Sequence, residues 1–559
     1  MLSGGGARGA AHIGVLKILE ELRIPVDVIT GTSMGAIVGG FYAAGSSPAE
    51  IEAMVNSLEW SEAFRDRPPL EDYSFRRKED SANYLIRFDA GVREGKLALP
   101  RGLIQGQNLN FILKSRLIHT ATVTDFDRLR IPFRAVAADI ETGEAVVLGT
   151  GDLAEAIRAS MSIPGVFAPV ELDGRLLVDG GIADNLPADV ARSMGADILI
   201  AVNIGTLRRP REKLTSAMTI TAQVMTILIQ KNTDEQIAAL CAEDILLHPP
   251  LGDIGSSDFA RAPEAIKIGE ESARRSIARL AGLSLPPAAY ETWLAVQRRQ
   301  PVLLPVIAGV AVDNRSPIGA SVVRAQIRTK PGEPLSLETL EQDLKRIHSI
   351  DTFEKADFHL NEKDGKTDLL IETREKSWGP HYLCFGFSLV DDLNGSAGYN
   401  LSASLTSTAL NRLGAEWANQ IQIGDTPRFF SEFYQPLDES LRYFIATRVE
   451  YKSWNINNYS EGILLSQYRA SAIEAGLARL IYYRLASTGL GEFQMPLYAG
   501  FSLEAGNAWA TRSDISGRTL IYAGSLLVGA ETYLGPLYLA YGQAEGGHHS
   551  LYIYLGHKF

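Results

Sequence analysis

The sequence predicts a protein of several domains: an α/β domain, then a small unit of one strand, two helices and two strands, and then an antiparallel β domain. Three observations lead to this prediction. Strands and helices alternate through the first half, a short β-α-α-β-β pattern follows, and the last third alternates apolar and polar residues. At 559 residues the chain is also too long for one hydrophobic core. The predicted boundaries are 1–275 for the α/β domain, 276–305 for a linker, 306–376 for the small unit and 377–559 for the β domain.

Composition excludes some classes of protein. A net charge of −12 argues against a nucleic-acid-binding protein, which usually has a basic surface. Cys241 and Cys384 lie in different predicted domains, so they favour two separate thiols and leave the redox compartment open. No apolar run is long enough to predict a transmembrane helix.

Met1 and Leu2 leave no room for a strand before the next motif, so we expect a first strand, and any export signal before it, to be missing from this version of the chain.

A glycine-rich turn opens the chain and leads into a helix. The turn consists of Gly4, Gly5, Gly6, Ala7, Arg8 and Gly9. Its G-x-G-x-x-G spacing, with Asp27 further on, also fits a dinucleotide-binding fingerprint, but that signal is weak alone. Glycine amides at a helix N-terminus can instead form an oxyanion hole, to which Arg8 would add positive charge. The motif that follows favours the oxyanion hole over a nucleotide site or a merely flexible loop.

That motif is the stretch around which the rest of the chain is organised. An apolar strand runs through Gly31-Thr32-Ser33-Met34-Gly35 into a helix of small residues. This is the G-x-S-x-G pattern of a nucleophile elbow, in which Gly31 and Gly35 avoid clashes around an exposed serine hydroxyl. The helix that follows points its positive dipole end at Ser33, which favours an oxyanion beside it. Ser33 is therefore the candidate nucleophile.

The region up to residue 170 contains an insertion and then more of the sheet. Residues 65–95 are charged and aromatic, and with Ile104–Gln107 they predict either a lid over the site or an ordinary surface insertion. The predicted elements after them are strands at 133–139 and 145–148, a helix at 153–160 and a proline-broken loop at 160–167.

A serine nucleophile needs a base within hydrogen-bond reach. The strand Leu176–Asp179 ends in Asp179-Gly180-Gly181, which in isolation is also a common turn. The histidines that could serve instead, His12, His119 and His248, are in no recognisable motif. Asp179 is therefore the best candidate base, in a Ser-Asp dyad.

Four motifs in this order resemble those of the patatin-like phospholipases. They are the glycine turn at 4–9, the serine turn at 31–35, the segment 160–167 with its Ile163-Pro164, and the turn at 179–181. The resemblance covers roughly residues 1–275 and implies a three-layer α/β/α fold. It implies that Ser33 attacks an ester carbonyl, that Asp179 accepts its proton, and that amides of Gly4, Gly5 and Gly6 hold the oxyanion. The products would be a fatty acid and a lysophospholipid, and no metal or other cofactor is implied.

The small unit combines one strand, two helices and a hairpin. The predicted elements are a strand at 306–312, a helix, a second helix at 337–348 capped by Ser336, and strands at 356–362 and 367–373. The turn between the last two strands contains Asp364-Gly365, which suits a hairpin. The unit is similar to a POTRA domain; a generic small α/β module is the alternative.

The last 179 residues, 381–559, show the alternation of a transmembrane β-barrel, with a soluble β-sandwich as the alternative. The predicted strands lie near 382–390, 397–407, 413–423, 428–435, 442–452, 460–468, 475–486, 497–508, 520–533, 536–543 and 550–558. The terminal Phe559 resembles the signal by which outer-membrane barrels are recognised for assembly, and His548-His549 indicates a solvated turn rather than a metal site.

The three domains in this order resemble the bacterial patatin-type autotransporters. The resemblance implies a lipase anchored in the outer membrane of a Gram-negative cell, with phospholipid as substrate and with outer-membrane lipid and the barrel-assembly machinery as partners; a homodimer stays open. The alternative is a translocation or assembly protein with an inactive patatin-like domain. The family leads us to expect sixteen strands, which need about 200 residues. We therefore expect ten or twelve strands here, with hairpins lost near 454–474 and an imperfectly closed sheet.

Overall fold

The computed structural model describes the whole chain except residues 67–89, 206–207, 300–302, 392–396, 461–462, 479–482, 491–492, 507–515, 533–534 and 556–559. Its contacts separate two units. The first contains residues 1–66, 101–306 and 359–368, and the described residues of the second lie within 90–100, 307–358 and 369–555. Among the described helices, none has both the length and the apolar character needed to cross a membrane.

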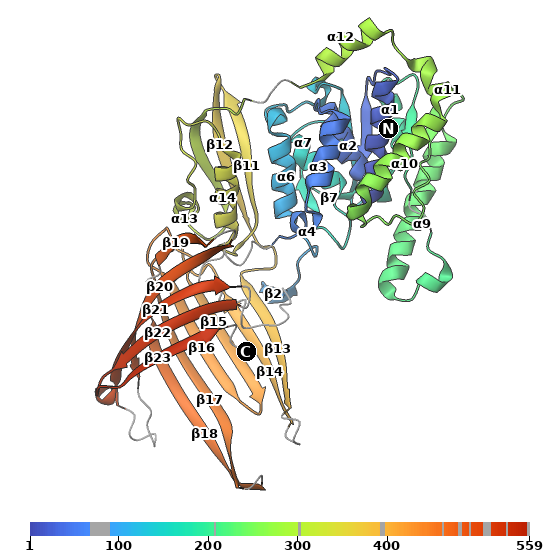
Figure 1. Ribbon diagram of the computed structural model, residues 1–559. Coiled ribbons are helices and arrows are strands. Elements are labelled where there is room, and N and C mark those ends of the chain that lie inside the picture. Colours follow the sequence, from blue (N-terminus) through green and yellow to red (C-terminus); the bar gives the residue numbers. More distant parts are fainter. Residues whose placement is uncertain are drawn as a thin grey trace. The chain divides into compact units, whose positions relative to one another are not determined.

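The first unit has a mixed sheet at its centre (Figure 1). Its strands are β1 (Ile29–Thr32), β4 (Phe133–Asp139), β5 (Ala145–Leu148), β6 (Val170–Leu172) and β7 (Arg175–Asp179), followed by the parallel pair β8 (Ile200–Val202) and β9 (Ile245–Leu247). The order β1-β4-β7-β6 places β4 in the middle, parallel to β1 and antiparallel to β7. The predicted strands at 133–139 and 145–148 and the predicted strand ending at Asp179 are confirmed.

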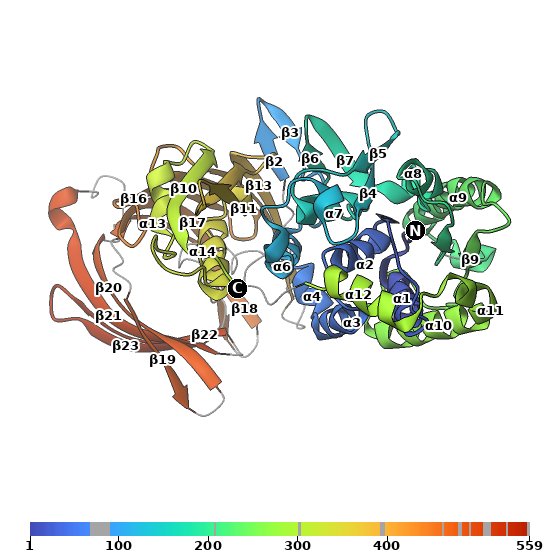
Figure 2. The ribbon, with the colours of Figure 1, turned by 90° about the horizontal axis from the view of Figure 1, so that it is seen from above.

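Helices surround this sheet. They are α1 (Ala11–Glu21), α2 (Met34–Ala43), α3 (Pro48–Ser57), α4 (Trp60–Ala63), α6 (Gln107–Arg116), α7 (Leu153–Ser160), α8 (Ala188–Ser193), α9 (Ala217–Ala238), α10 (Ala262–Arg275), α11 (Ile277–Leu280) and α12 (Pro287–Gln297). Figure 2 shows α1, α3 and α10 together on one side of the sheet. Helices α1 and α10 lie so close that a Cβ on Gly14 would come within 2.0 Å of the Ile266 carbonyl oxygen. The α/β domain is therefore present as the sequence predicts.

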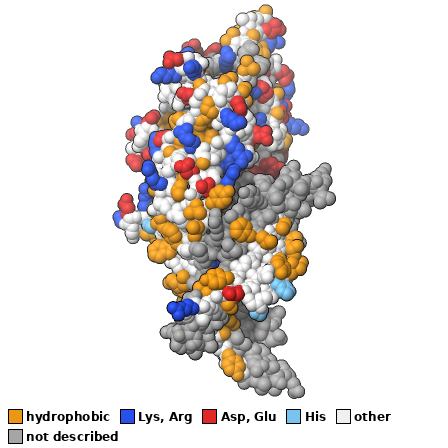
Figure 3. Space-filling view, turned by 90° about the vertical axis from the view of Figure 1, so that its left-hand side faces the viewer, with side chains coloured by type: hydrophobic (Ala, Val, Ile, Leu, Met, Phe, Trp, Pro, Cys, Tyr) orange, Lys and Arg blue, Asp and Glu red, His pale blue; other side chains and the backbone are white. Residues whose placement is uncertain are grey.

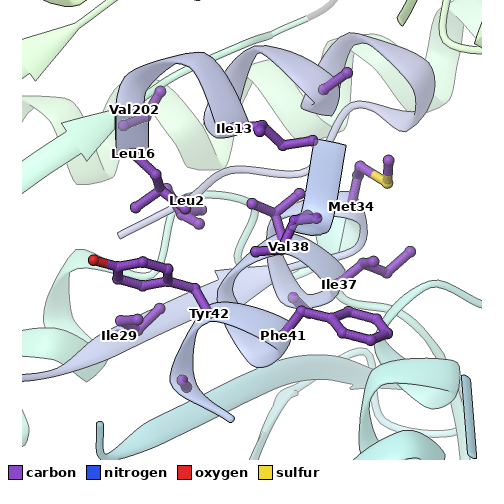
Figure 4. Packing of buried hydrophobic residues seen from close by; sticks show 14 of the residues in the cluster. Leu2, Ile13, Leu16, Ile29, Met34, Ile37, Val38, Phe41, Tyr42 and Val202 are labelled. Atoms are coloured by element: carbon purple, nitrogen blue, oxygen red, sulfur yellow. The ribbon is translucent and has the colours of Figure 1, made fainter. Parts of the chain in front are cut away.

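The core lies between the helices and the strand that carries the serine turn. Side chains from α1, β1 and α2 meet around Leu2 and Val38 (Figure 4). Leu2 forms parallel bridges with both Gly31 and Val202, so it lies between β1 and β8. A cavity of about 350 Å³ adjoins this position, with Leu16 and Leu199 in its wall.

The predicted linker at 276–305 is packed onto the first unit for much of its length. Pro287 begins α12, where its missing N–H costs no helical hydrogen bond. At the end of α12, the Gln297 side chain donates to the Tyr42 carbonyl at 3.0 Å, and Arg299 pairs with Glu50 at 2.9 Å. These contacts make the segment part of the domain, although its prolines suggest a linker.

The small unit has the predicted element order. Its elements are β10 (Ile307–Arg315), α13 (Ala320–Ala325), α14 (Leu337–His348), β11 (Phe353–Lys363) and β12 (Lys366–Glu375), with the sheet order β10-β12-β11. The Ser336 hydroxyl accepts the Thr339 N–H at 3.1 Å, which caps α14 as predicted. Asp364 and Gly365 both have positive φ, 53° and 69°, as a two-residue hairpin turn requires.

The carboxyl-terminal region contains eleven described strands, close to the eleven predicted segments. They are β13 (His381–Asp391), β14 (Ala397–Ser407), β15 (Glu416–Gly424), β16 (Arg428–Pro436), β17 (Phe444–Ser460), β18 (Ile463–Ala478), β19 (Tyr483–Leu490), β20 (Phe493–Gly506), β21 (Ile521–Thr532), β22 (Gly535–Ala544) and β23 (His549–Leu555). Neighbouring strands pair antiparallel, in one sheet from β13 to β18 and another from β19 to β23. Within the described residues no ladder joins the two sheets, so they do not form a closed barrel there. Phe559 lies outside the described residues.

The stretch 454–474, where hairpins are expected to be lost, contains one irregularity, and the loss itself stays a prediction. Strands β17 and β18 pair through this stretch, with one register shift between Asn458 and Tyr459. Backbone pairing does not need side-chain alternation, so the polar run at 455–458 does not end the ladder. The break between the sheets falls after β18 instead.

The first of these sheets has one apolar and one polar face. Exposed apolar side chains share a face across the paired strands, among them Phe385, Leu401, Trp417, Ile421, Phe429 and Tyr451. The alternate residues are polar and less exposed, including Glu416, Glu432 and the ion pair between Arg428 and Glu450 at 2.7 Å. Figure 3 shows hydrophobic side chains gathered over the strand-rich lower half of one face, where few charged ones are drawn.

Part of the predicted insertion joins this sheet. Strands β2 (Ala90–Arg93) and β3 (Lys96–Ala98) form a hairpin, and β2 pairs antiparallel with β13. Gly91 lies opposite Tyr382 in this pairing. The rest of the insertion, 67–89, lies outside the described residues, and its role as a lid stays a prediction.

Candidate active site

Ser33 is in the turn between β1 and α2, with φ 54° and ψ −121°, a strained conformation for a residue with a side chain. Its backbone N–H donates to the Ser160 hydroxyl at 2.9 Å, and that hydroxyl donates to the Val136 carbonyl at 2.5 Å. A Cβ on Gly31 would lie 2.5 Å from the Gly35 carbonyl oxygen, and a Cβ on Gly35 would lie 2.2 Å from the Leu2 carbonyl oxygen, so both positions need glycine. The strand-turn-helix geometry predicted for this segment is present.

Asp179 lies at the end of β7, two strands away from β1 in the sheet. The Ser33 hydroxyl lies beside its carboxylate, and the Gly181 N–H donates to that carboxylate at 2.8 Å. Burial raises the pKa of the Asp179 carboxyl to about 6, although the Ser33 hydroxyl and the Gly181 N–H both act to lower it. Gly180 is held against β4, where a Cβ would lie 2.2 Å from the Val136 carbonyl oxygen. The structure therefore brings the two predicted catalytic side chains together.

The glycine loop runs beside Ser33. A Cβ on Gly4 would come within 3.0 Å of the Ser33 Cβ. The Gly4 N–H donates to Asn185, at 3.1 Å to the side-chain oxygen and 3.2 Å to the carbonyl oxygen, so it is already engaged. The Gly5 and Gly6 N–H groups donate to no described residue. Gly6 has a φ of 59°, which favours glycine. The Gly4 amide thus has an acceptor within the protein whereas those of Gly5 and Gly6 have none among the described residues, and the oxyanion role of the three amides stays a prediction.

Arg8 is buried, and its nitrogen atoms are directed at loop carbonyls. Nε donates to Ile204 at 2.9 Å, Nη1 to Ile254 at 2.6 Å and Nη2 to Gly205 at 2.9 Å. The guanidinium therefore ties the glycine loop to two neighbouring loops. Its nitrogen atoms are engaged by these carbonyls, in contrast to the expectation that Arg8 adds positive charge to the oxyanion hole. Gly9 allows the same loop to pass α2, since a Cβ there would lie 2.3 Å from the Met34 Cγ.

The histidines contact other groups. His12 is buried, its Nε2 lies 2.8 Å from the Ser3 carbonyl oxygen, and burial lowers its pKa to about 4. His119 Nε2 lies 3.0 Å from the Ala44 carbonyl oxygen. No described hydrogen bond joins either ring, or that of His248, to Ser33 or Asp179. Among the described residues no cluster of three or more His, Cys, Asp or Glu side chains could hold a metal ion.

Sequence reasoning missed the residues that position the site. Ser160 holds the Ser33 amide, and Asn185 holds the glycine loop. Asn185 also donates to the Thr233 hydroxyl at 3.2 Å, and Asn232 donates to the Gly181 carbonyl at 3.0 Å, so α9 braces the Asp179 turn. The partners in each of these hydrogen bonds are 48 to 181 residues apart in sequence, although Ser160 itself lies in one of the motifs. No local spacing could have revealed them.

A second network connects the segment 104–107 to the base. The Asp66 carboxylate accepts the N–H groups of Gln105, Gly106 (2.7 Å) and Gln107 (2.9 Å) at the start of α6. Arg158 is buried beside it, donates to the Ser162 hydroxyl at 2.6 Å, and has its pKa lowered to about 10 by that burial. The Ser162 carbonyl in turn accepts the Asp179 N–H at 2.8 Å.

Comparison with known proteins agrees with this geometry. Residues 1–192 match the family model of the patatin-like phospholipases. Patatin-like phospholipase domain-containing protein 7 of Rattus norvegicus is 34% identical over 208 residues, covering 37% of this chain and 13% of that protein. An uncharacterized NTE family protein of Mycobacterium tuberculosis is 35% identical over 204 residues, covering 36% of this chain and 48% of that protein. The chain thus spans less than half of each of these relatives.

A solved structure of BamA from Haemophilus ducreyi is 11% identical and covers 44% of this chain and 49% of its own, with a TM-score of 0.30. VipD from Legionella pneumophila is 16% identical and covers 49% of this chain and 66% of its own, with a TM-score of 0.27. The sequence match, together with the geometry around Ser33, leads to one conclusion. The amino-terminal part of this chain contains a patatin-like phospholipase domain.

Proposed function

We propose that the chain is a serine lipid acyl hydrolase of the phospholipase A type, acting through a Ser33–Asp179 dyad in a three-layer α/β/α domain. One observation carries the proposal: the Ser33 hydroxyl lies beside a buried carboxylate, in a strained turn next to a glycine loop. A hydroxyl in this setting has a base to take its proton and amides to receive the developing charge.

The reaction follows from these contacts. As the Ser33 oxygen bonds to the acyl carbon, its proton passes to Asp179, and the carbonyl oxygen becomes an oxyanion. The N–H groups of Gly5 and Gly6 stabilise that charge. The ester C–O bond then breaks, and Asp179 returns the proton to the leaving lysophospholipid. In the second half, water gives its proton to Asp179 and attacks the acyl-enzyme, releasing the fatty acid and restoring Ser33.

We also propose that the carboxyl-terminal sheets anchor the enzyme in the outer membrane of a Gram-negative bacterium, with the unit at 307–375 acting as a POTRA-like domain and with barrel-assembly machinery as a partner. Support comes from the first sheet, which exposes apolar side chains such as Ile421 and Phe429 and turns polar ones such as Glu432 to its other face. This is the alternation expected of lipid-facing strands, and it is unfavourable for a sheet whose outer face meets water.

Release of fatty acid from phospholipid vesicles tests the proposed activity. The purified full chain in detergent should release fatty acid, and a serine-directed fluorophosphonate should abolish the release. A chain that binds vesicles yet releases no fatty acid would favour the translocation or assembly alternative, in which the patatin-like domain is inactive.

A further inference from the structure

The first half of α9 exposes an apolar stripe. Its members are Ile220, Val224, Ile227 and Leu228, which are between 43% and 52% exposed. Their spacing of four, seven and eight residues places them on one face of the helix. Further along that face the exposed residues are Lys231, Asp234 and Glu235. Apolar exposure is therefore confined to the half of α9 that projects from its domain (Figure 1).

A basic loop lies along the same half of the helix. It contains four exposed cations, Arg208, Arg209, Arg211 and Lys213, and one acid, Glu212. The Arg209 N–H donates to the Gln223 side chain at 3.0 Å, and the Arg208 side chain donates to Gln230 at 2.5 Å, which fixes the loop against α9. None of the four cations forms an ion pair with a described residue. With four cations and one acid, the loop has a net charge of +3 in a chain whose net charge is −12.

The other half of α9 reaches the catalytic turn. Asn232 donates to the Gly181 carbonyl at 3.0 Å, and Thr233 accepts from Asn185, which holds the glycine loop. With a rise of about 1.5 Å per residue, Val224 is only about 12 Å along the helix from Asn232. One rigid element thus extends from the apolar stripe to the residues that position Asp179.

We infer that the apolar stripe and the basic loop form a docking face for an anionic phospholipid bilayer, which presents substrate to Ser33. This inference rests on the proposed phospholipase function. Exposed apolar side chains beside arginine and lysine suit a surface that lies in a membrane interface, and here the loop at 208–213 rather than α9 itself supplies the cations. The cations contact headgroup phosphates while the stripe enters the acyl boundary. A protein partner for this face would need acidic groups in place of headgroups.

A fluorescent probe on α9 tests docking without catalysis. In a full chain carrying Cys241→Ser, Cys384→Ser and Ser33→Ala, an environment-sensitive dye is attached at Val224→Cys, or at Glu235→Cys as the matched control on the same face. With phosphatidylglycerol vesicles, the dye at 224 should shift to the blue and be quenched by spin-labelled acyl chains, and the dye at 235 should not. With phosphatidylcholine vesicles the response at 224 should be weaker. Equal responses at both positions, or none at 224, would overturn the inference.

Hydrolysis by the enzyme with Ser33 intact gives the second readout. Ile220→Ser combined with Val224→Ser and Leu228→Ser should lower the rate on phosphatidylglycerol vesicles about tenfold, relative to the same variant's rate on a short-chain soluble ester. Arg211→Gln with Lys213→Gln should raise the vesicle concentration for half-maximal rate about fivefold per charge removed. Asp234→Ser with Glu235→Ser is the matched control and should change neither. Full activity on vesicles in both test variants would contradict the docking face and leave the proposed hydrolase function standing. A wild-type chain that is inactive on both substrates would instead contradict the hydrolase function itself.

Discussion

In the proposed reaction, Ser33 and Asp179 divide the chemical work between two strands of one sheet. The turn after β1 fixes the Ser33 backbone through Ser160, and burial at the end of β7 raises the basicity of Asp179. A carboxylate with a raised pKa is a better proton acceptor at neutral pH than an ordinary aspartate, and it is still ionised there. The proposed dyad therefore needs no histidine.

Asp179→Asn should be almost as damaging as removal of the nucleophile, because the amide cannot accept the Ser33 proton. A general base contributes about 10² to 10⁴ in rate, so kcat on a soluble ester should fall by that factor. His119→Ala and His248→Ala serve as controls and should keep most activity, since neither ring contacts Ser33 or Asp179. An essential histidine would instead indicate a triad.

The pH dependence of kcat/KM should report the Asp179 carboxyl. Its protonated form cannot accept a proton, so activity is lost as pH falls below the pKa of about 6 and is constant above it. The expected slope is about tenfold per pH unit on the acid side. We expect an inflection near pH 6 with a soluble ester; an inflection near pH 4, the value of an unperturbed aspartate, would contradict the buried site.

At the scale of elements, the glycine loop, the Asp179 turn and α9 form one hydrogen-bonded assembly through Asn185 and Asn232. Loss of the Asn185 side chain would leave the Gly4 N–H only its bond to the residue 185 carbonyl and would break the link to Thr233, which allows the loop to move relative to Ser33. Such misplacement affects the transition state more than substrate binding.

Asn185→Ala should therefore lower kcat by about tenfold to a hundredfold with little change in KM. Thr233→Val is the matched variant, because it removes only the outer hydrogen bond of Asn185 and keeps the bond to Gly4. It should stay within about threefold of wild type. Equal losses of kcat in both variants, in step with thermal stability, would indicate a structural role only.

Sequence reasoning succeeded for local patterns and failed for long-range contacts. The serine turn, the strand ending at Asp179 and the elements of the small unit follow from spacing within about 20 residues, and the structure has them. The roles of Ser160, Asn185 and α9 depend on hydrogen bonds between distant segments. Arg8 is another example. Its positive charge suggests a contact with the oxyanion, but in the folded chain its guanidinium donates to backbone carbonyls of distant loops.

At the scale of the whole molecule, the carboxyl-terminal sheets were predictable as strands but not as a closed structure. Alternation identifies a strand and its two faces, whereas closure depends on pairing between strands far apart in the chain. Among the described strands, β18 and β19 follow one another in sequence but belong to two different sheets and do not pair with each other.

Charge placed on the apolar face should weaken the proposed membrane anchoring. Ile421→Arg should place a cation among the side chains proposed to face lipid, at a cost of about 2 to 4 kcal/mol near the bilayer midplane. Gln420→Arg puts the same charge on the polar face and is the control. The measurement is the fraction of the chain that stays in the membrane after alkaline extraction. Equal retention of both variants would count against lipid contact by this face.

The central claim is that Ser33 is the nucleophile of a lipid acyl hydrolase, and its most direct test is fatty-acid release by the full chain with and without Ser33→Ala. Loss of the nucleophile should lower the rate by about 10⁴ or more, by analogy with serine hydrolases in general, with the circular dichroism spectrum unchanged. In the wild-type chain, the fluorophosphonate adduct should map to Ser33 by mass spectrometry. Retention of a tenth of the activity by a folded Ser33→Ala variant would contradict the account.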